Sequence, residues 1–534
     1  MMRRLATLSL LFAAVACGGG SKDSTTTPGA ATSADEGPGG DAAQPTRLPD
    51  IPASPAPMPD GVLATVSIGD PQGQLTQLGA FGDAVQPGLG AMVGTQFMNS
   101  LSSIVGVPGL AGYDLAKPVY VIFFDPQRGG ADFLLVVAVQ NEQQLVGSVG
   151  GGSMVQVHDG YAAVGRGAAL MAGSAYALSN LAKTAPPKEP HAVIHMNRVM
   201  DSYRGRLEQE LQQSMGKSNT DAERKAAEGM LKAISSIERI EASIEASATS
   251  ATVSLSVFPT QGSTLAAWSS AQQPAAYDVA ARLPKGPWLM VAAGRIDWSP
   301  MKEFWTAIAQ AQGNAKLSEW FGAVGKEVAF AVWAKKNAIR MAGLVEVVDG
   351  KLLTGLMAEY IKEMAAAPKK MDSMQVVAKA NAHQTGGAKL HGITIQPGAG
   401  ADPETKKEWE TLYGKGGMQS YFGLAGSWLV FALDRDKDAR PLVAKVVQGA
   451  KAKKAPKSTL EAVFERAIAD SKARKESGLM VFDIAAVATD PVAAKGAEVT
   501  AGLAFEGPVI KTRVTVPPQT GAVLMKAAMG GGGI

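Results

Sequence analysis

Thr252-Val253-Ser254-Leu255-Ser256-Val257 alternates polar and apolar residues without a break. A period of two places the apolar side chains on one face of a β-strand and the polar ones on the other. One apolar and one polar face are typical of an antiparallel sheet that is covered on a single side. The stretch therefore predicts an antiparallel sheet with one exposed face.

A second stretch, 510–516, alternates in the same way, and other blocks of the chain recur with these two in one order. The matched blocks are 58–66 with 283–291, 119–124 with 328–333, 133–139 with 339–347, 159–164 with 426–431, 192–197 with 479–484, and 253–259 with 511–517. Recurrence in one order predicts a tandem duplication of a single module. We place the two modules at 56–275 and 280–530.

The segments between the predicted strands carry helix signals. Ser458 and Glu461 fit a capping box ahead of an apolar stripe, and Pro300 fits the first turn of another helix. We therefore expect an α+β fold in which each module has a mainly antiparallel sheet and packed helices. The copies differ by inserts, a polar helical pair at about 198–238 in the first module and a helical segment at about 351–380 in the second.

The N-terminus has the parts of a secretory signal: two arginines, a short apolar run at 5–16, and small residues up to Cys17, which is the one cysteine of the chain. The junction Ala14-Val15-Ala16-Cys17 resembles the lipobox of bacterial lipoproteins, although Ala14 stands where leucine is usual. The resemblance implies that residues 1–16 are removed as a signal peptide, and that Cys17 is lipidated with diacylglycerol and a fatty acid such as palmitate. The alternative is an ordinary secretory signal that ends near a cysteine. At 12 residues, the apolar run is shorter than the roughly 20 that a membrane-spanning helix needs.

Residues 17–59 are expected to form a disordered linker that begins at the lipidated cysteine. Gly, Ser, Thr, Pro, Ala and Asp dominate this segment without hydrophobic periodicity. Such a segment cannot bury enough apolar surface to offset its ordering entropy. As a flexible coil, it would hold the globular part roughly 35 Å from the membrane on average.

The charge balance argues against two classes of partner. Removing residues 1–16 leaves 49 basic and 48 acidic residues, so the mature protein is close to neutral. A near-neutral protein is a poor candidate for binding nucleic acid or for general adhesion to anionic lipid. One cysteine allows no internal disulfide, so stability must come from the core that 46% hydrophobic residues can supply.

The sequence contains no complete catalytic motif. Ser214 with Lys217 and Ser299 with Lys302 fit Ser-x-x-Lys, but the Ser-Asp-Asn and Lys-Thr-Gly elements of penicillin-recognising enzymes do not occur. Gly216-Lys217-Ser218 ends like a P-loop, but Leu211 stands where the first glycine is required. We therefore expect a protein that is not an enzyme and takes no cofactor. An enzyme with an unrecognised site is an alternative.

Metal-binding patterns are also incomplete. His191 and His195 are four residues apart, which suits two ligands on a helix, but the intervening Ala-Val-Ile favours a strand. The stretch 434–438 begins like a calcium loop, but Ala439 and Lys445 stand where Gly and Glu are needed. We expect two histidines at a strand surface, a strand-to-helix turn capped by Asp, and no metal site.

The tryptophans give a candidate ligand cleft. All eight lie at or after Trp268, and five of them crowd into one stretch: Trp288, Trp298, Trp305, Trp320 and Trp333. These five could line a cleft for a lipid, a glycan or a peptide. The alternative is that they are core residues.

Three segments carry a wider resemblance: Leu283-Pro284-Lys285-Gly286 with its following strand, Asp159-Gly160-Tyr161, and 477–484. They are similar to exported bacterial proteins built from repeated modules of a domain of unknown function. The resemblance covers most of 56–530 and implies an envelope location with no known activity.

We therefore predict a membrane-anchored envelope lipoprotein that acts as a non-catalytic binding or scaffold component. Its partners would be the membrane, through the N-terminal lipid, and an envelope protein, with no nucleic acid. The alternative is a carrier of a lipid or another apolar ligand. Gly18 rather than aspartate follows Cys17, so the enteric sorting rule favours the outer membrane over the inner membrane.

Overall fold

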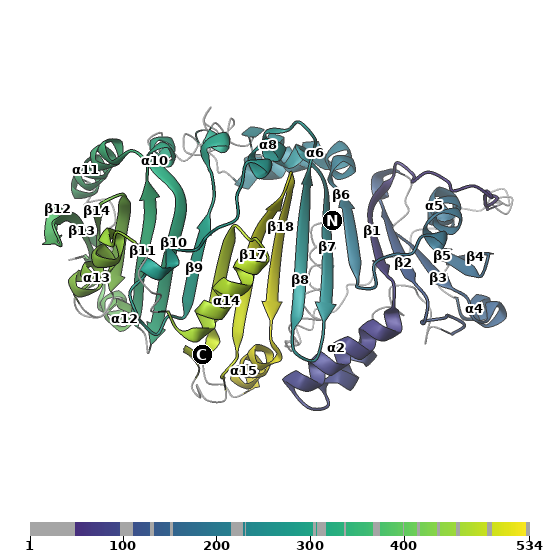
Figure 1. Cartoon of the computed structure of the whole chain (residues 1–534). Helices are drawn as coiled ribbons and strands as arrows, with labels where there is room; N and C mark the ends of the chain where they lie inside the picture. Colours follow the sequence, from purple (N-terminus) through teal and green to yellow (C-terminus); the bar gives the residue numbers. More distant parts are fainter. Residues whose placement is uncertain are drawn as a thin grey trace. The chain divides into compact units, whose positions relative to one another are not determined.

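The chain divides into two compact units, which are described separately below. The computed structural model describes residues 48–96, 111–128, 133–149, 153–214, 228–229, 231–302, 306, 317–335, 338–366, 374–398, 400–413, 417–434, 438–454, 460–486, 488 and 494–529. Unit 1 comprises Met1–Ile194, Ile244–Ala251 and Leu524–Gly533, and unit 2 comprises His195–Ser243, Thr252–Val523 and Ile534. Antiparallel strands and interspersed helices make up both units, so the fold is α+β, as the sequence predicts (Figure 1).

Unit 1 is built on an antiparallel sheet of short strands in the order β6-β1-β2-β3-β5-β4. The strands are β1 (Val62–Ile68), β2 (Val119–Phe124), β3 (Phe133–Ala138), β4 (Met154–His158), β5 (Tyr161–Gly165) and β6 (His191–His195). The β4–β5 hairpin turns at Asp159 and Gly160, whose φ angles are 49° and 77°. Two positive φ angles are what a two-residue turn between twisted strands requires.

Both faces of the unit 1 sheet are covered. Helix α5 (Gly167–Ser179) packs on the face that carries Leu134 and Val136. On the opposite face, Leu135 and Val137 are buried together with Leu145 of α4 (Glu142–Ser148). The alternating side chains of β3 are therefore buried on both sides, which explains why its sequence reads as a continuous apolar run.

The end of the predicted linker lies against unit 1. Three apolar side chains of this end pack on the core: Leu48, Ile51 and Met58. The Ala56 N–H donates to Ser179 Oγ at 2.9 Å, and Asn180 Nδ2 donates to the Ala56 carbonyl at 3.2 Å. The average composition of the linker is polar, but the apolar residues near its end provide enough apolar surface to pack on the core. Residues 17–47 lie outside the described residues.

Unit 2 has a larger antiparallel sheet in the order β12-β13-β14-β15-β11-β10-β9-β16-β17-β18, and β18 also pairs with β8. The strands are β8 (Ala251–Pro259), β9 (Met290–Arg295), β10 (Val324–Lys335), β11 (Ala338–Val347), β12 (Met374–Thr385), β13 (Ala388–Pro397), β14 (Met418–Ala425), β15 (Trp428–Asp434), β16 (Gly478–Asp483), β17 (Glu498–Glu506) and β18 (Val509–Val516).

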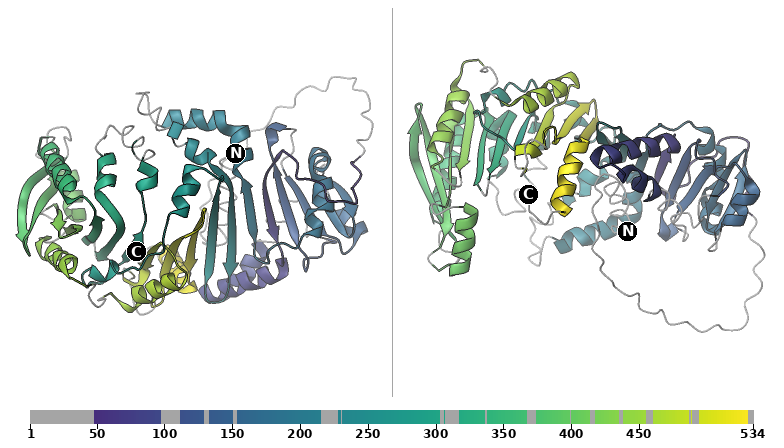
Figure 2. Two further views of the ribbon diagram at one scale, coloured as in Figure 1. Left: turned by 45° about the horizontal axis from the view of Figure 1, so that its top comes forward. Right: turned by 90° about the horizontal axis from the view of Figure 1, so that it is seen from below.

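Two helices cover one face of this sheet, α13 (Arg440–Lys451) over β15 and β11, and α14 (Ala462–Ala473) over β16 (Figures 1 and 2). Val443, Val446 and Phe464 from these helices are fully buried in the main core. Helix α14 begins after Glu461, whose side chain makes no capping hydrogen bond. The capping box predicted from Ser458 and Glu461 is therefore not formed by Glu461, and Ser458 lies outside the described residues.

A buried ion pair crosses this core. Glu476 is 3% exposed, and Arg513 on β18 donates to its carboxylate from Nε at 2.5 Å and from Nη2 at 3.2 Å. Ser471 Oγ donates to the same carboxylate at 2.6 Å and lies 2.7 Å from the Tyr277 hydroxyl. A Cβ at Gly502 would overlap the carboxylate, so β17 needs glycine at this position. The pair joins the segment after α14 to β18.

The predicted inserts contain secondary structure. Helix α6 (Met196–Ser214) begins the insert predicted at about 198–238, whose second part lies largely outside the described residues. The segment predicted at about 351–380 contains α11 (Gly350–Ala366) and the start of β12. Pro300 lies in a short 3-10 turn, Ser299–Met301, and the described residues that follow it, Lys302 and Thr306, are α-helical.

Candidate functional site

The second face of the unit 2 sheet is apolar, although α13 and α14 do not cover it. On β15, the side chains toward those helices are almost fully buried: Trp428 (8% exposed), Val430 (0%) and Ala432 (1%). The side chains between them are only half-buried: Leu429, Phe431 and Leu433. Because both sets are apolar, β15 has the composition of a strand covered on both sides. We call the side that carries Phe431 the open face.

Two helices border a pocket on the open face. Helix α11 buries Leu353 and Met357 against the sheet, next to α10 (Leu317–Ala323). The pocket has a volume of about 400 Å³. Its lining is Trp320 and Tyr360 from the helices, with Met341, Ile393, Ser420, Phe422, Leu429, Phe431 and Leu433 from the sheet. Tyr421 and Ala432, which pair with each other and pack with the main core, also border it. We call it the aromatic pocket.

Three rings form one wall of the aromatic pocket. The Trp320 and Tyr360 rings meet edge to face, with centroids 6.4 Å apart and planes at 85°. The Tyr360 and Phe422 rings are 6.2 Å apart at 63°. Edge-to-face contacts of this kind add stabilisation beyond the area that they bury, so the wall is a defined surface.

The floor of the pocket depends on strand register. Phe431 on β15 pairs with Gly343 on β11 and with Phe422 on β14. A Cβ at Gly343 would overlap the Phe431 ring, so the ring occupies the space above the glycine. Met341 on β11 is the direct cross-strand partner of Leu433 on β15. Residues far apart in the sequence thereby become neighbours on one surface.

The lining of the aromatic pocket offers little polarity. It contains no Asp, Glu, Lys, Arg or His side chain, and the Ser420 hydroxyl donates to the Ile393 carbonyl at 3.3 Å. His391, which pairs with Phe422, is 7% exposed, and burial lowers its pKa below the usual range. The imidazole is therefore neutral at neutral pH. An apolar group would lose few polar contacts by entering the pocket.

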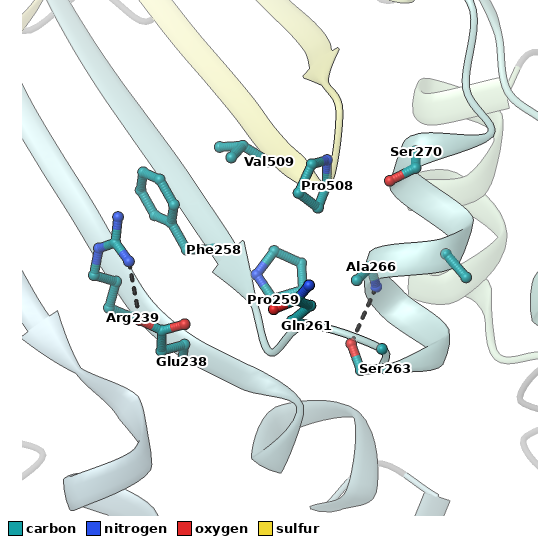
Figure 3. Close-up of a pocket in the computed structure, with 12 residues that line it drawn as sticks. Glu238, Arg239, Phe258, Pro259, Gln261, Ser263, Ala266, Ser270, Pro508 and Val509 are labelled. Atoms are coloured by element: carbon teal, nitrogen blue, oxygen red, sulfur yellow. Dashed lines mark hydrogen bonds and ion pairs between the residues drawn. The ribbon is translucent and has the colours of Figure 1, made fainter.

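A second pocket, of about 520 Å³, lies beside the start of α8 (Thr264–Ser270) and the ends of β8 and of β7 (Ile237–Ala246). Figure 3 shows Arg239 beside Phe258, and the guanidinium lies 3.8 Å from the ring centroid. Arg239 donates to Glu241 at 2.8 Å and to Glu238 at 3.0 Å. The hydrogen bond to Glu241 raises the pKa of Arg239. Two carboxylates thus compensate this cation, which argues against an anion site here.

The described tryptophans of the predicted cleft lie in different settings. Trp288 is 2% exposed, and its indole N–H donates to the Pro284 carbonyl at 2.9 Å. Trp298 stacks on Trp268 with ring centroids 6.0 Å apart. Both side chains are thus engaged in local packing.

Trp333 and Trp320 also differ in their surroundings. The Arg340 guanidinium lies 4.2 Å from the Trp333 ring centroid, whereas Trp320 lines the aromatic pocket. Trp305 and the predicted lipidation site Cys17 lie outside the described residues. Among the described members of the predicted set, Trp320 lines the aromatic pocket.

The incomplete motifs have structural explanations. His191 and His195 lie on strand β6, as the intervening residues predict. Asp434 pairs with Arg340 at 2.8 Å, and Asp438 accepts the Arg440 N–H at 3.0 Å in the turn before α13. The N-cap of α13 is Ala439, which makes no side-chain capping hydrogen bond, so the predicted Asp cap is wrong. The described residues contain no group of three or more His, Cys, Asp or Glu that could hold a metal ion. None of the described helices is both long and apolar enough to cross a membrane.

Sequence reasoning missed most of the pocket, including Tyr360, Met341 and Phe431. One signal was present in the sequence: the six residues Trp428–Leu433 are apolar on both faces of the strand, unlike the alternating 252–257 and 510–516. Comparisons of the chain with protein-family models, with curated protein sequences and with solved structures found no match.

Proposed function

We propose that the chain is a lipid-anchored protein of the bacterial envelope that acts by binding rather than by catalysis, and that it holds an apolar ligand on the open face of unit 2. One observation carries this proposal: half-buried apolar side chains on β15 lead into a pocket whose lining has no charged group. A ligand that covered this surface would gain about 25 cal/mol for each Å² of apolar area removed from water.

The envelope location rests on the sequence. An n-region, a short apolar run and small residues before Cys17 support a lipoprotein signal peptide at 1–16. The membrane, through the N-terminal lipid, and an envelope protein are the proposed partners. Gly18 favours the outer membrane, and the near-neutral charge argues against nucleic acid.

We also propose that the modules at 56–275 and 280–530 are tandem copies. Strand order supports this, since β6-β1-β2-β3-β5-β4 in unit 1 parallels β16-β9-β10-β11-β15-β14 in unit 2. Five of these strands fall in the collinear blocks that the sequence matches in pairs. Helices α5 and α13 follow corresponding strands, β5 and β15.

Native mass spectrometry of the full protein, extracted gently from its own membranes, tests the binding function. We expect a retained mass that matches an apolar small molecule. The Leu433→Asn variant should lose it, because the substitution places an amide on the open face. Val348→Asn is the matched control, since Val348 is 66% exposed and does not line the pocket.

Two outcomes would contradict the carrier function. A protein that carries no ligand and takes up no apolar probe would remove its support. A retained protein in place of a small molecule would favour a scaffold role instead.

A further inference from the structure

We infer that the aromatic pocket receives the methyl end of a single unbranched acyl chain, and that the rest of the chain lies along the open face toward β17. This inference rests on the proposed function and specifies the class and the direction of its ligand. The carrying observation is a row of apolar side chains that begins at the pocket and crosses the sheet.

The row follows from the strand register. Leu433 pairs with Met341, Met341 with Val332, Val332 with Met290, Met290 with Phe482, and Phe482 with Val499. All six side chains are half-buried. Directly paired residues lie on the same face of a sheet, and neighbouring strands are about 4.8 Å apart. The apolar row therefore spans roughly 24 Å from β15 to β17.

The chemistry of the lining decides which end of an amphiphile enters. A charged headgroup would lose its hydration in the aromatic pocket and meet no opposite charge there. A methyl end has no hydrogen bonds to water that it could lose, and it buries apolar area in the pocket. The tail therefore enters the pocket, and the headgroup stays outside.

An acyl chain also fits better than a peptide segment. A peptide brings an N–H and a C=O group with every residue, and buried groups without partners are costly. The pocket lining offers few side-chain partners: the Ser420 hydroxyl already donates to the Ile393 carbonyl, and the other hydroxyls are those of Tyr360 and Tyr421. An unbranched acyl chain has no such groups and can lie along the row of paired apolar side chains.

Brominated fatty acids test the direction, because bromine quenches nearby tryptophan fluorescence. We expect bromine near the methyl end to quench the full-length protein more strongly than bromine near the carboxyl end. Trp320→Phe should abolish that difference, whereas Trp298→Phe should retain it. Equal quenching, or the reverse order, would overturn the tail-first inference even if the fatty acids bind.

A chain-length series tests the row. Affinity should rise roughly threefold to fourfold for each added methylene until the apolar row is covered, and then level off. Met290→Gln should weaken long chains by roughly tenfold and leave short chains unchanged. Equal loss for short and long chains would overturn the role of the row. A protein that binds no apolar probe would instead defeat the proposed function itself.

Discussion

At the residue scale, the buried ion pair between Arg513 and Glu476 contributes to the stability of unit 2. Replacing Arg513 with Met leaves the buried Glu476 carboxylate without its main partner, a change that typically costs about 3–5 kcal/mol. Arg474 Nε lies 3.4 Å from the same carboxylate, so we expect a loss near the lower limit, about 3 kcal/mol, in urea-induced unfolding. Lys511→Met, which removes an exposed pair on the same strand, should cost less than about 1 kcal/mol. Equal losses in the two variants would contradict this account.

The carboxyl group of Asp483 makes the free energy of unfolding depend on pH. Burial raises the pKa of Asp483, and burial together with Asp483 raises the pKa of Glu461. The folded state therefore holds protons that the unfolded state has released, so the free energy of unfolding falls as pH rises through the raised pKa values, starting from the ordinary 3.8 and 4.5. Asp483→Asn should flatten this fall and stabilise the protein at neutral pH. Thermal unfolding across pH measures it, and an unchanged slope would count against burial as the cause.

At the scale of elements, Gly343 links β11 to the aromatic pocket. A Cβ at this position would overlap the Phe431 ring, so Gly343→Ala must displace the ring. We expect a loss of about 1–3 kcal/mol in stability and weaker binding of apolar probes. Gly355→Ala on α11 is the matched control, because a Cβ there would have no atom within 4 Å and alanine favours a helix. Binding that survives Gly343→Ala unchanged would remove Phe431 from the site.

Elements were predictable where local pattern decides them. The alternation at 510–516 predicts β18, and Ala-Val-Ile between His191 and His195 predicts β6. The starts of helices were less predictable. The sequence predicts a capping box at Ser458 and Glu461, but the helix begins after Glu461 and has no side-chain cap there. The aromatic pocket could not be predicted, because Met341, Tyr360 and Phe431 meet only through strand register and helix docking.

At the scale of the whole molecule, the two sheets differ in how the face opposite α5 in unit 1 and opposite α13 in unit 2 is covered. In unit 1, Leu135 and Val137 of β3 are buried beside Leu145 of α4. In unit 2, Met341 of β11, whose sequence block matches that of β3, lines a pocket that α11 only borders. If the two modules are tandem copies, as we propose, strand order alone would suggest two ligand sites. Under the proposed binding function, packing leaves the site in unit 2, since an already filled face offers no surface to a ligand.

Hydrogen exchange on the full protein tests that asymmetry. Adding a long-chain fatty acid should slow exchange in β10, β11, β15 and α11, because a bound chain stabilises the elements that border the aromatic pocket. The β2, β3 and β5 amides of unit 1 should exchange at unchanged rates, because both faces of that sheet are filled by the protein itself. Leu433→Asn should abolish the slowing without affecting unit 1. Equal slowing in both units would mean that ligand binding follows the repeated strand order rather than the packing on each face.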